Sequence, residues 1–289
     1  SYIAFGTSLS LPAGIIIGYL VGIFVGMILP PLSSSFLQFH HGFSLYNVGF
    51  TSGVIAMMVA SIMRLFGEEI DTPRLIAEQY STGAGIFLTC LSLALLLTGF
   101  MINNRSPKGM KEIVDCPGTL VTDFVMEAGL GATMINMGIM GLLMIVFVIL
   151  LGGTFSGPIV GAVLTVIGFS AFGCHIKNSL PILAGVVLAA FISPMDTGDP
   201  FTLIMSALFG SSLAPIAGYY GIIPGIAAGF LHMTLVTNVT YLHGGLNLYN
   251  NGFSCGFVAA CMVPFLDMIN DIREERKNGR KGKSSPDRG

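Results

Sequence analysis

The sequence predicts an all-α protein: a polytopic transmembrane helical bundle with inverted internal repeats and re-entrant segments. Apolar residues make up 53% of the chain and charged residues only 10%, where soluble domains carry about a quarter charged residues. The apolar residues gather in long runs, and one stretch of sequence occurs twice. This composition excludes a soluble globular enzyme. The net charge of −2 also excludes a basic surface for nucleic acid.

Nine apolar segments are candidate membrane crossings, because a spanning helix needs about 20 mostly apolar residues. The clear ones are Leu11–Leu29, Leu45–Leu65, Gly83–Ile102, Ala132–Leu151, Ile159–Phe172, Pro224–Val236 and Leu246–Leu266. Leu180–Ile192 and Phe201–Tyr219 are shorter or broken by Gly and Pro, which indicates tilted, half-length or re-entrant helices. The Gly-rich block 152–158 is either a tight turn or the tip of a re-entrant segment.

The basic residues predict the orientation of the chain. Seven of the 13 Lys and Arg residues lie in the last 17 residues, and basic segments stay on the cytoplasmic side of a membrane. With nine crossings and the C-terminus inside, eleven of the 13 are cytoplasmic, and only Arg64 and Arg74 are external. We therefore predict a multi-pass protein of the cell membrane with a cytoplasmic C-terminus. The five cysteines form no C-x-x-C pair and are expected to be free thiols.

An internal repeat relates residues 12–56 to residues 215–259 at an offset of 203 residues, with 15 identities in 45 positions. Seven predicted crossings separate the copies, and an odd number inverts the second copy. Inverted repeats that hold a substrate site at their interface are common in transporters. In the first copy, Gly14, Gly18, Gly22 and Gly26 form a stripe at every fourth position, which allows a neighbouring helix to approach closely.

The repeat divides the chain into four expected regions. Residues 1–66 are the C-terminal part of the first repeat, and residues 67–127 are a connecting region with one transmembrane helix. Residues 128–270 are the second repeat. Residues 271–289 are a cytoplasmic disordered tail, because their mixed charges and Gly, Ser and Pro content cannot bury a core. The counterpart of residues 128–217 would precede residue 1, so we expect the chain to be part of a longer protein.

Polar residues that occur in both copies are candidates for a substrate path. They are His40, Tyr46 and Asn47 in the first copy and His243, Tyr249 and Asn250 in the second. Each set precedes or begins a predicted helix, whose first N–H groups are unpaired. Facing each other across the membrane centre, the two sets would offer hydrogen-bond donors and acceptors but no fixed charge. The alternative is that each set is an interfacial cap, with Tyr at headgroup depth and Asn closing a turn.

Three further ionisable residues are candidates. His232 lies in an apolar run, where such residues usually face a bundle interior or a cavity, so it is either part of the path or a hydrogen-bonded structural residue. Asp196 and Asp199 are flanked by Pro and Gly, and they are either turn residues or a site for a cation or an external substrate. We expect the segment Gly173–Asn178 to be a cytoplasmic loop. The sequence has no metal-ligand spacing, catalytic triad or nucleotide fingerprint, so we expect no metal, no cofactor and no enzymatic activity.

Several motifs are similar to those of known families. They are the run Gly157–Gly173, then His175, Lys177, Asn178 and Pro181, and later His243-Gly244-Gly245 and Tyr249–Phe253. Over roughly residues 120–266 the chain resembles an uncharacterised family of bacterial membrane proteins, chiefly from Firmicutes, which implies a longer multi-span protein and no particular activity. More distantly, the aromatic–Asn segments are similar to those of urea transporters, which have inverted repeats, but they lack the extra Gly between aromatic residues.

These observations favour an integral membrane transporter or channel-like protein for a small, polar and neutral solute, with the path between the two repeats. One alternative is a membrane scaffold or sensor without transport, which would not need duplicated polar residues at membrane depth. The other is an intramembrane enzyme, which would need a convergent acid/base pair or a metal group. The expected partners are the solute and the lipid bilayer, with a homo-oligomer left open and nucleic acid excluded.

Overall fold

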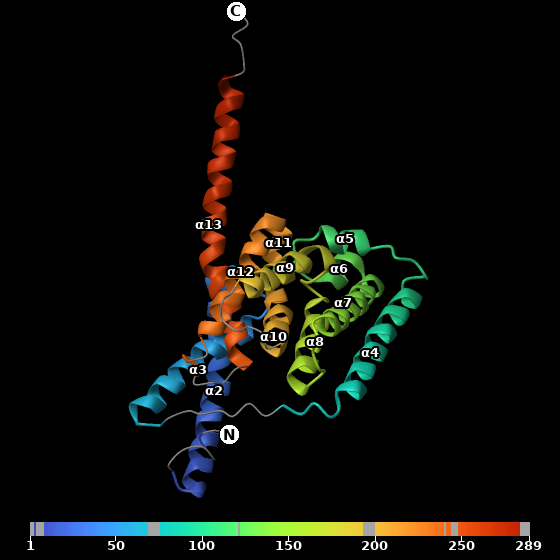
Figure 1. Cartoon of the computed structure of the whole chain (residues 1–289). Helices are drawn as coiled ribbons and strands as arrows, with labels where there is room; N and C mark the ends of the chain where they lie inside the picture. The colour runs from blue at the N-terminus through green and yellow to red at the C-terminus, as the bar shows by residue number, and fades with distance from the viewer. Residues whose placement is uncertain are drawn as a thin grey trace, which may run out of the picture.

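The computed structural model describes residues 3, 9–68, 76–120, 122–192, 200–239, 241–243 and 248–283. In this part of the chain the regular structure is helical throughout, as Figure 1 shows, which confirms the predicted all-α class. The elements are α2 (Leu11–Phe39), α3 (Asn47–Leu65), α4 (Ser81–Ile102), α5 (Met110–Asp115), α6 (Phe124–Ala128), α7 (Leu130–Leu150), α8 (Gly157–Phe169), α9 (Ile176–Ile192), α10 (Pro200–Gly210), η1 (Ser211–Leu213), α11 (Ala214–Tyr220), α12 (Ile222–Asn238) and α13 (Leu248–Lys283).

Each of the predicted apolar segments coincides with a helix. Six helical units are long and apolar enough to cross a membrane, namely α2, α3, α4, α7, α13 and the unit Pro200–Tyr220 formed by α10, η1 and α11. The apolar helices α8, α9 and α12 are shorter. α8 has 13 residues, so it is about 20 Å long, against the ~30 Å of a hydrocarbon core. The protein is therefore an integral membrane protein built as a helical bundle.

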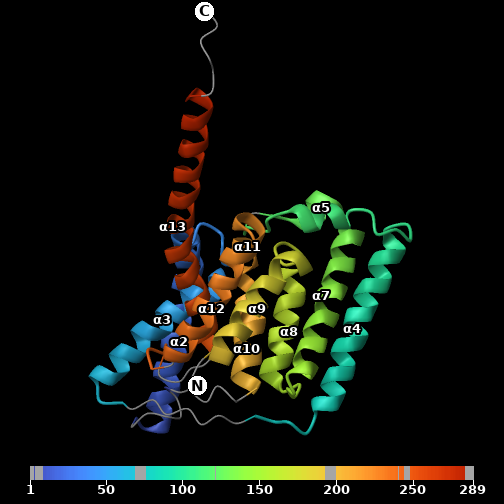
Figure 2. The same cartoon turned by 45° about the horizontal axis from the view of Figure 1, so that its top comes forward.

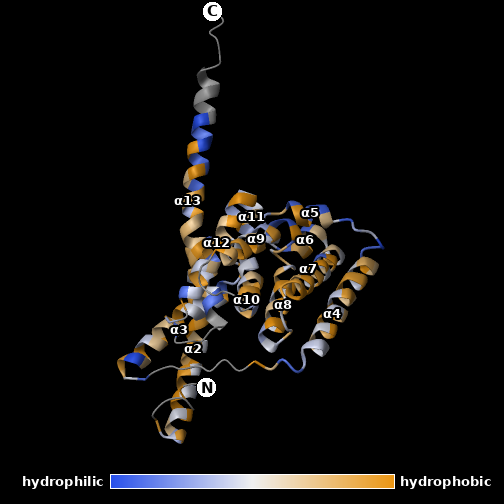
Figure 3. Cartoon of the chain, viewed as in Figure 1, coloured by the Kyte–Doolittle hydropathy of each residue, from blue (hydrophilic) through white to orange (hydrophobic). Residues whose placement is uncertain are grey.

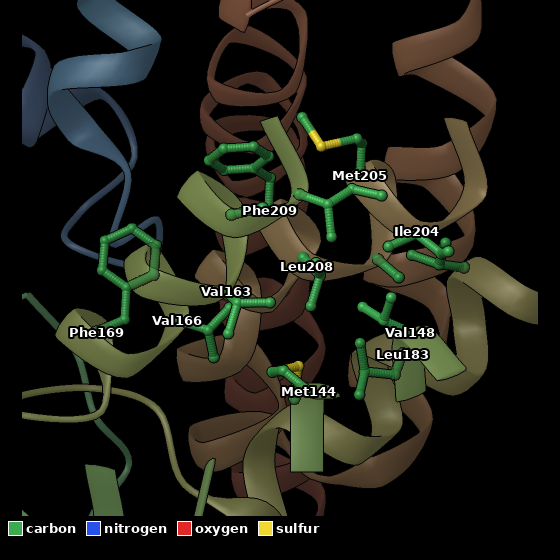
Figure 4. Packing of buried hydrophobic residues seen from close by; sticks show 14 of the residues in the cluster. Met144, Val148, Val163, Val166, Phe169, Leu183, Ile204, Met205, Leu208 and Phe209 are labelled. Carbon is green, nitrogen blue, oxygen red and sulfur yellow. The ribbon is translucent and has the colours of Figure 1, made fainter. Parts of the chain in front are cut away.

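The main core lies where α7, α8, α9 and α10 meet (Figure 4). Met144 of α7, Val163 of α8, Leu183 of α9 and Leu208 of α10 are buried there. Glycines bring the helices close together: a Cβ on Gly138 of α7 would lie 2.7 Å from Leu96 Cβ of α4. Because lipid supplies little hydrophobic drive between helices, this close backbone approach is what packs them.

The first copy of the repeat lies beside this bundle, as Figures 1 and 2 show. The loop between α2 and α3 joins it to the bundle: Leu45 N donates to Ser212 O at 2.9 Å, and Leu120 N donates to Gly42 O at 2.9 Å. In Figure 1, α3 descends from the centre to the lower left, whereas its repeat equivalent α13 rises to the C-terminus at the top. The two equivalent helices therefore run in opposite senses.

The C-terminal segment differs from the expectation. α13 continues as a helix to Lys283, so the predicted disordered tail from residue 271 is wrong for residues 271–283. The helical residues 271–276 are exposed. Figure 3 shows that this upper part of α13 is more hydrophilic than its lower part. Helical structure is thus compatible with a segment that buries no core.

Candidate functional site

Equivalent residues of the two repeats meet where α3 crosses α13. A Cβ on Gly252 would lie 2.5 Å from the carbonyl carbon of Gly49, its repeat equivalent, so neither position has room for a side chain. One residue further along, the rings of Phe50 and Phe253 stack with centroids 6.0 Å apart. Contact between a residue and its own equivalent is what a two-fold relation produces at its axis.

The predicted His and Asn residues form the same hydrogen bond in both copies. His40 Nε2 lies 2.9 Å from Asn47 Oδ1, and His243 Nδ1 lies 2.7 Å from Asn250 Oδ1. Each bond joins the residue before the loop to the start of the next helix. Both His side chains are fully buried. The repeated sequence therefore encodes a repeated hydrogen-bonded pair with a buried His, and we call the two pairs the His–Asn pairs.

The protonation of each pair follows from its partners. Asn47 Nδ2 donates to the Ser33 carbonyl at 2.9 Å, which fixes the amide oxygen towards His40. Because that oxygen only accepts, His40 Nε2 must carry the hydrogen, and a neutral ring then leaves Nδ1 as an acceptor. In the second copy the nitrogen outside the pair is Nε2 of His243. Both of these nitrogens are buried without a hydrogen-bond partner, and an unpaired buried polar group costs about 1–3 kcal/mol.

Aromatic rings separate the two His–Asn pairs. The His40 ring meets Phe50 edge-on at 6.1 Å, and the His243 ring meets Phe253 at 5.1 Å in the same geometry. The stacked Phe50 and Phe253 rings therefore lie between the two histidines. The ring contacts run from His40 to Phe50, from Phe50 to Phe253, and from Phe253 to His243.

The ring of Tyr46 packs against the bundle. The Tyr46 ring stacks on Phe209 of α10 at 5.3 Å and lies over Gly49, where a Cβ would come within 2.6 Å of the ring. Tyr46 thus packs into the bundle core and makes room for the crossing of α3 and α13. The side chain of Tyr249 lies outside the described residues.

His232 belongs to a different cluster. Its Nδ1 lies 3.0 Å from Ser254 Oγ, and its Nε2 lies 3.0 Å from the Ser206 carbonyl. Cys255 Sγ contacts the ring at 3.4 Å, and His232 is fully buried between α10, α12 and α13. Both ring nitrogens are therefore engaged, as in a hydrogen-bonded structural His. Asp196 and Asp199, proposed for a cation or external ligand, lie outside the described residues.

The sequence reasoning missed a second polar network around the turn between α8 and α9. Asn136 Nδ2 donates to the carbonyls of Ser170 and Cys174, each at 2.8 Å. Asn178 Nδ2 donates to the Gly173 carbonyl at 2.8 Å, and His175 Nε2 lies 3.0 Å from the Cys116 carbonyl. Within the segment expected to be a cytoplasmic loop, Gly173, Cys174, His175 and Asn178 are buried, whereas Ile176 and Lys177 are exposed. An Asn within the apolar run of α7 was the available sign, since a buried amide needs partners.

Three cavities of the structure lie away from the His–Asn pairs. An apolar groove of about 1020 Å³ separates α2 from α3, and two smaller hollows lie near Ser81 and near Thr154. Among the described residues, no group of three or more His, Cys, Asp or Glu side chains is placed to hold a metal ion.

Comparison with protein families gives one match. A family model described as "Protein of unknown function (DUF1576)" matches residues 1–65 and 102–268. The matched parts contain both copies of the repeat and both His–Asn pairs. No curated protein and no solved structure matches the chain. The predicted resemblance to an uncharacterised family is confirmed at this level: the chain belongs to the DUF1576 family of proteins of unknown function.

Proposed function

We propose that this protein is a transporter or channel-like protein for a small, polar and neutral solute. In this proposal the path lies between two inverted repeats related by a pseudo-two-fold axis in the membrane plane. The opposite senses of α3 and α13 support the inversion, as do the contacts of Gly49 with Gly252 and of Phe50 with Phe253. Inverted repeats of this kind form substrate sites in many transporters. No enzymatic activity is part of the proposal.

The duplicated His–Asn pair is the observation that carries this proposal. In each pair one ring nitrogen of the His is buried without a hydrogen-bond partner, so a small solute that forms hydrogen bonds would satisfy both. Neither pair contains a charged side chain, which favours a neutral solute over an ion. The similarity of the aromatic–Asn segments to urea transporters points to the same class, and it makes urea one of the first solutes to test.

The rings between the pairs suggest how access is controlled. His40 and His243 are both fully buried, so a solute reaches them only when the two copies move relative to each other. Rocking about the crossing of Gly49 and Gly252 would separate Phe50 from Phe253 and open one side at a time, as in alternating access. We place the basic end of α13 on the cytoplasmic side of the cell membrane, because basic segments remain there.

The test is solute flux into liposomes that contain the purified protein. Flux is followed by stopped-flow light scattering with urea, formamide and glycerol, and with a charged solute for comparison. Asn47→Leu and Asn250→Leu each remove one amide that orients a His, and an unpaired group costs about 1–3 kcal/mol. We expect flux of the transported solute to fall about ten- to a hundredfold, since 1.4 kcal/mol is a factor of ten. Asn238→Leu, at an exposed Asn on α12, is the matched control.

Two outcomes would contradict the proposal. One is an absence of flux above empty liposomes for every solute in the panel, and it would favour a scaffold or sensor. The other is unchanged flux in both Asn variants with a lowered melting temperature in detergent, which would make the pairs structural caps. Measuring flux and melting on the same samples separates these cases.

A further inference from the structure

Two glycines of the α2 stripe, Gly22 and Gly26, have no helix of the described part of the chain against them, although their equivalents in the second copy do. A Cβ on Gly229 of α12 would lie 2.1 Å from the Ile182 carbonyl oxygen of α9, and a Cβ on Gly225 would lie 2.9 Å from Pro181 Cβ. The equivalents of these glycines in α2 are Gly26 and Gly22, and among the described residues no atom lies within 4 Å of a Cβ built on either. The same residues thus pack a helix in one copy and face open space in the other.

A deep apolar groove lies next to this open face. It runs between α2 and α3, has a volume of about 1020 Å³, and is lined by residues that include Leu32, Ile55 and Val59. Their repeat equivalents are Leu235, Val258 and Met262, which pack in a cluster with Ile182 of α9 and with Leu213 and Ile216. In the second copy, therefore, α9 both covers the glycines and contributes a side chain to the equivalent groove.

We propose that the open face of α2, with the groove between α2 and α3, binds an apolar membrane-spanning helix of the α9 type. The contacts of α9 define that type: a Pro181-Ile182 step that meets the glycines, and Gly185, whose Cβ would lie 2.0 Å from the Ile226 carbonyl oxygen. Small residues at such contacts let membrane helices approach and bond through their backbones. The proposal is independent of transport.

A helix of this type fits the surface better than a second copy of α2. Two α2 stripes packed together would allow close approach of the two backbones but would leave the groove without side chains to fill it. An α9-type helix presents Ile at the groove and Gly at the close contact. The surface exposes large apolar side chains around the stripe, with Ile23 at 60% and Phe24 at 62% exposed, so a docked helix buries them without desolvating charge.

The probe for this surface is a synthetic peptide of residues 176–192, with lysines added at its ends and a donor dye. It is reconstituted in lipid bicelles with the full-length protein, which carries an acceptor dye at its C-terminus. We expect saturable energy transfer with the wild-type protein. The double variant Gly22→Leu/Gly26→Leu should weaken binding at least tenfold, because the new side chains occupy the contact. A peptide with Gly185→Leu should bind equally poorly.

Controls keep the experiment decisive. Met27→Leu changes a residue that is 71% exposed on another face of α2, and it should bind like the wild type. The melting temperature of the Gly22→Leu/Gly26→Leu variant checks its folding, which we expect to be intact because Gly22 and Gly26 have no neighbours. Absence of saturable binding to the wild type would overturn the proposal. So would equal binding by the double variant, which would mean that the peptide replaces α9 on α12.

Discussion

The second copy of the repeat is packed inside the bundle, and the first copy lies on its outside. In α12 the buried residues are Gly225, Ala228, Gly229, His232, Met233 and Val236. In the much longer α2 they are only Gly14 and Ser33. The two helices align without a gap in sequence, so their different burial comes from their neighbours. α9 packs against α12, and no helix of the described residues occupies the equivalent place beside Gly22 and Gly26 of α2.

Some features survive this difference in surroundings. The His–Asn hydrogen bond and the edge-on contact of His with Phe occur in both copies, because they join residues close in sequence. Other features change. Gly221 takes φ +100° and interrupts the helix between α11 and α12, whereas its equivalent Gly18 lies within the continuous helix α2. The contacts between residues close in sequence are thus the same in both copies, whereas the continuity of the helix differs with the elements packed against it.

The largest expected effect comes from matched substitutions at one pair of equivalent glycines. Gly229→Leu places a side chain against the Ile182 carbonyl, 2.1 Å from its Cβ, and should destabilise the protein by about 3 kcal/mol, the upper end of the usual range for overpacking. Gly26→Leu meets no atom within 4 Å and should stabilise α2 by up to about 1 kcal/mol through helix propensity. Melting temperature and monodispersity in detergent measure both. Similar destabilisation by the two variants would show that the copies are packed alike.

An intermediate effect is expected at the break before α12. Gly221 has φ +100° and ψ −177°, a region that is essentially restricted to Gly and costs other residues about 1–3 kcal/mol. Nothing lies within 4 Å of a Cβ there, so the cost of Gly221→Ala is confined to the backbone. Gly22→Ala, inside α2 and equally free of neighbours, should instead stabilise by about 0.5–1 kcal/mol. Opposite shifts in melting temperature support the comparison, and a stabilising Gly221→Ala would contradict it.

Much of the fold could be predicted because a membrane-spanning helix corresponds to one contiguous run of apolar residues in the sequence. The runs at residues 83–102 and 132–151, for example, differ from α4 and α7 by only two residues at either end. The break at Gly221 could not be predicted, since Gly18 has the same identity and a helical conformation. The composition of residues 271–283 did not predict that α13 extends to Lys283, because mixed charges with few apolar residues are also typical of disordered segments.

The candidate site could be predicted as a set of residues but not as a geometry. The repeat singled out His40, Asn47, His243 and Asn250, and the structure brings them together in pairs. It did not show that two Phe rings separate the pairs, since Phe50 and Phe253 read as ordinary apolar repeat positions. The position of the Tyr46 ring depends on Phe209, which is remote in sequence. Contacts between distant elements have no local pattern from which to infer them.

The smallest expected effect concerns a hydrogen bond that helps to hold α11 against α13 in the second copy. Tyr220 Oη donates to Asp267 Oδ1 at 2.6 Å, and at the same offset the first copy has Ile17 and Arg64, which cannot form this bond. Asp267 is exposed to the surroundings, so solvent or headgroups replace part of the interaction, and Tyr220→Phe should cost only about 1 kcal/mol. Tyr219→Phe is the control, because that side chain is 59% exposed and its ring contacts remain. A lower melting temperature for Tyr220→Phe alone would show that this bond helps to keep the second copy packed where the first is open, and equal melting of the two variants would leave that role to α9.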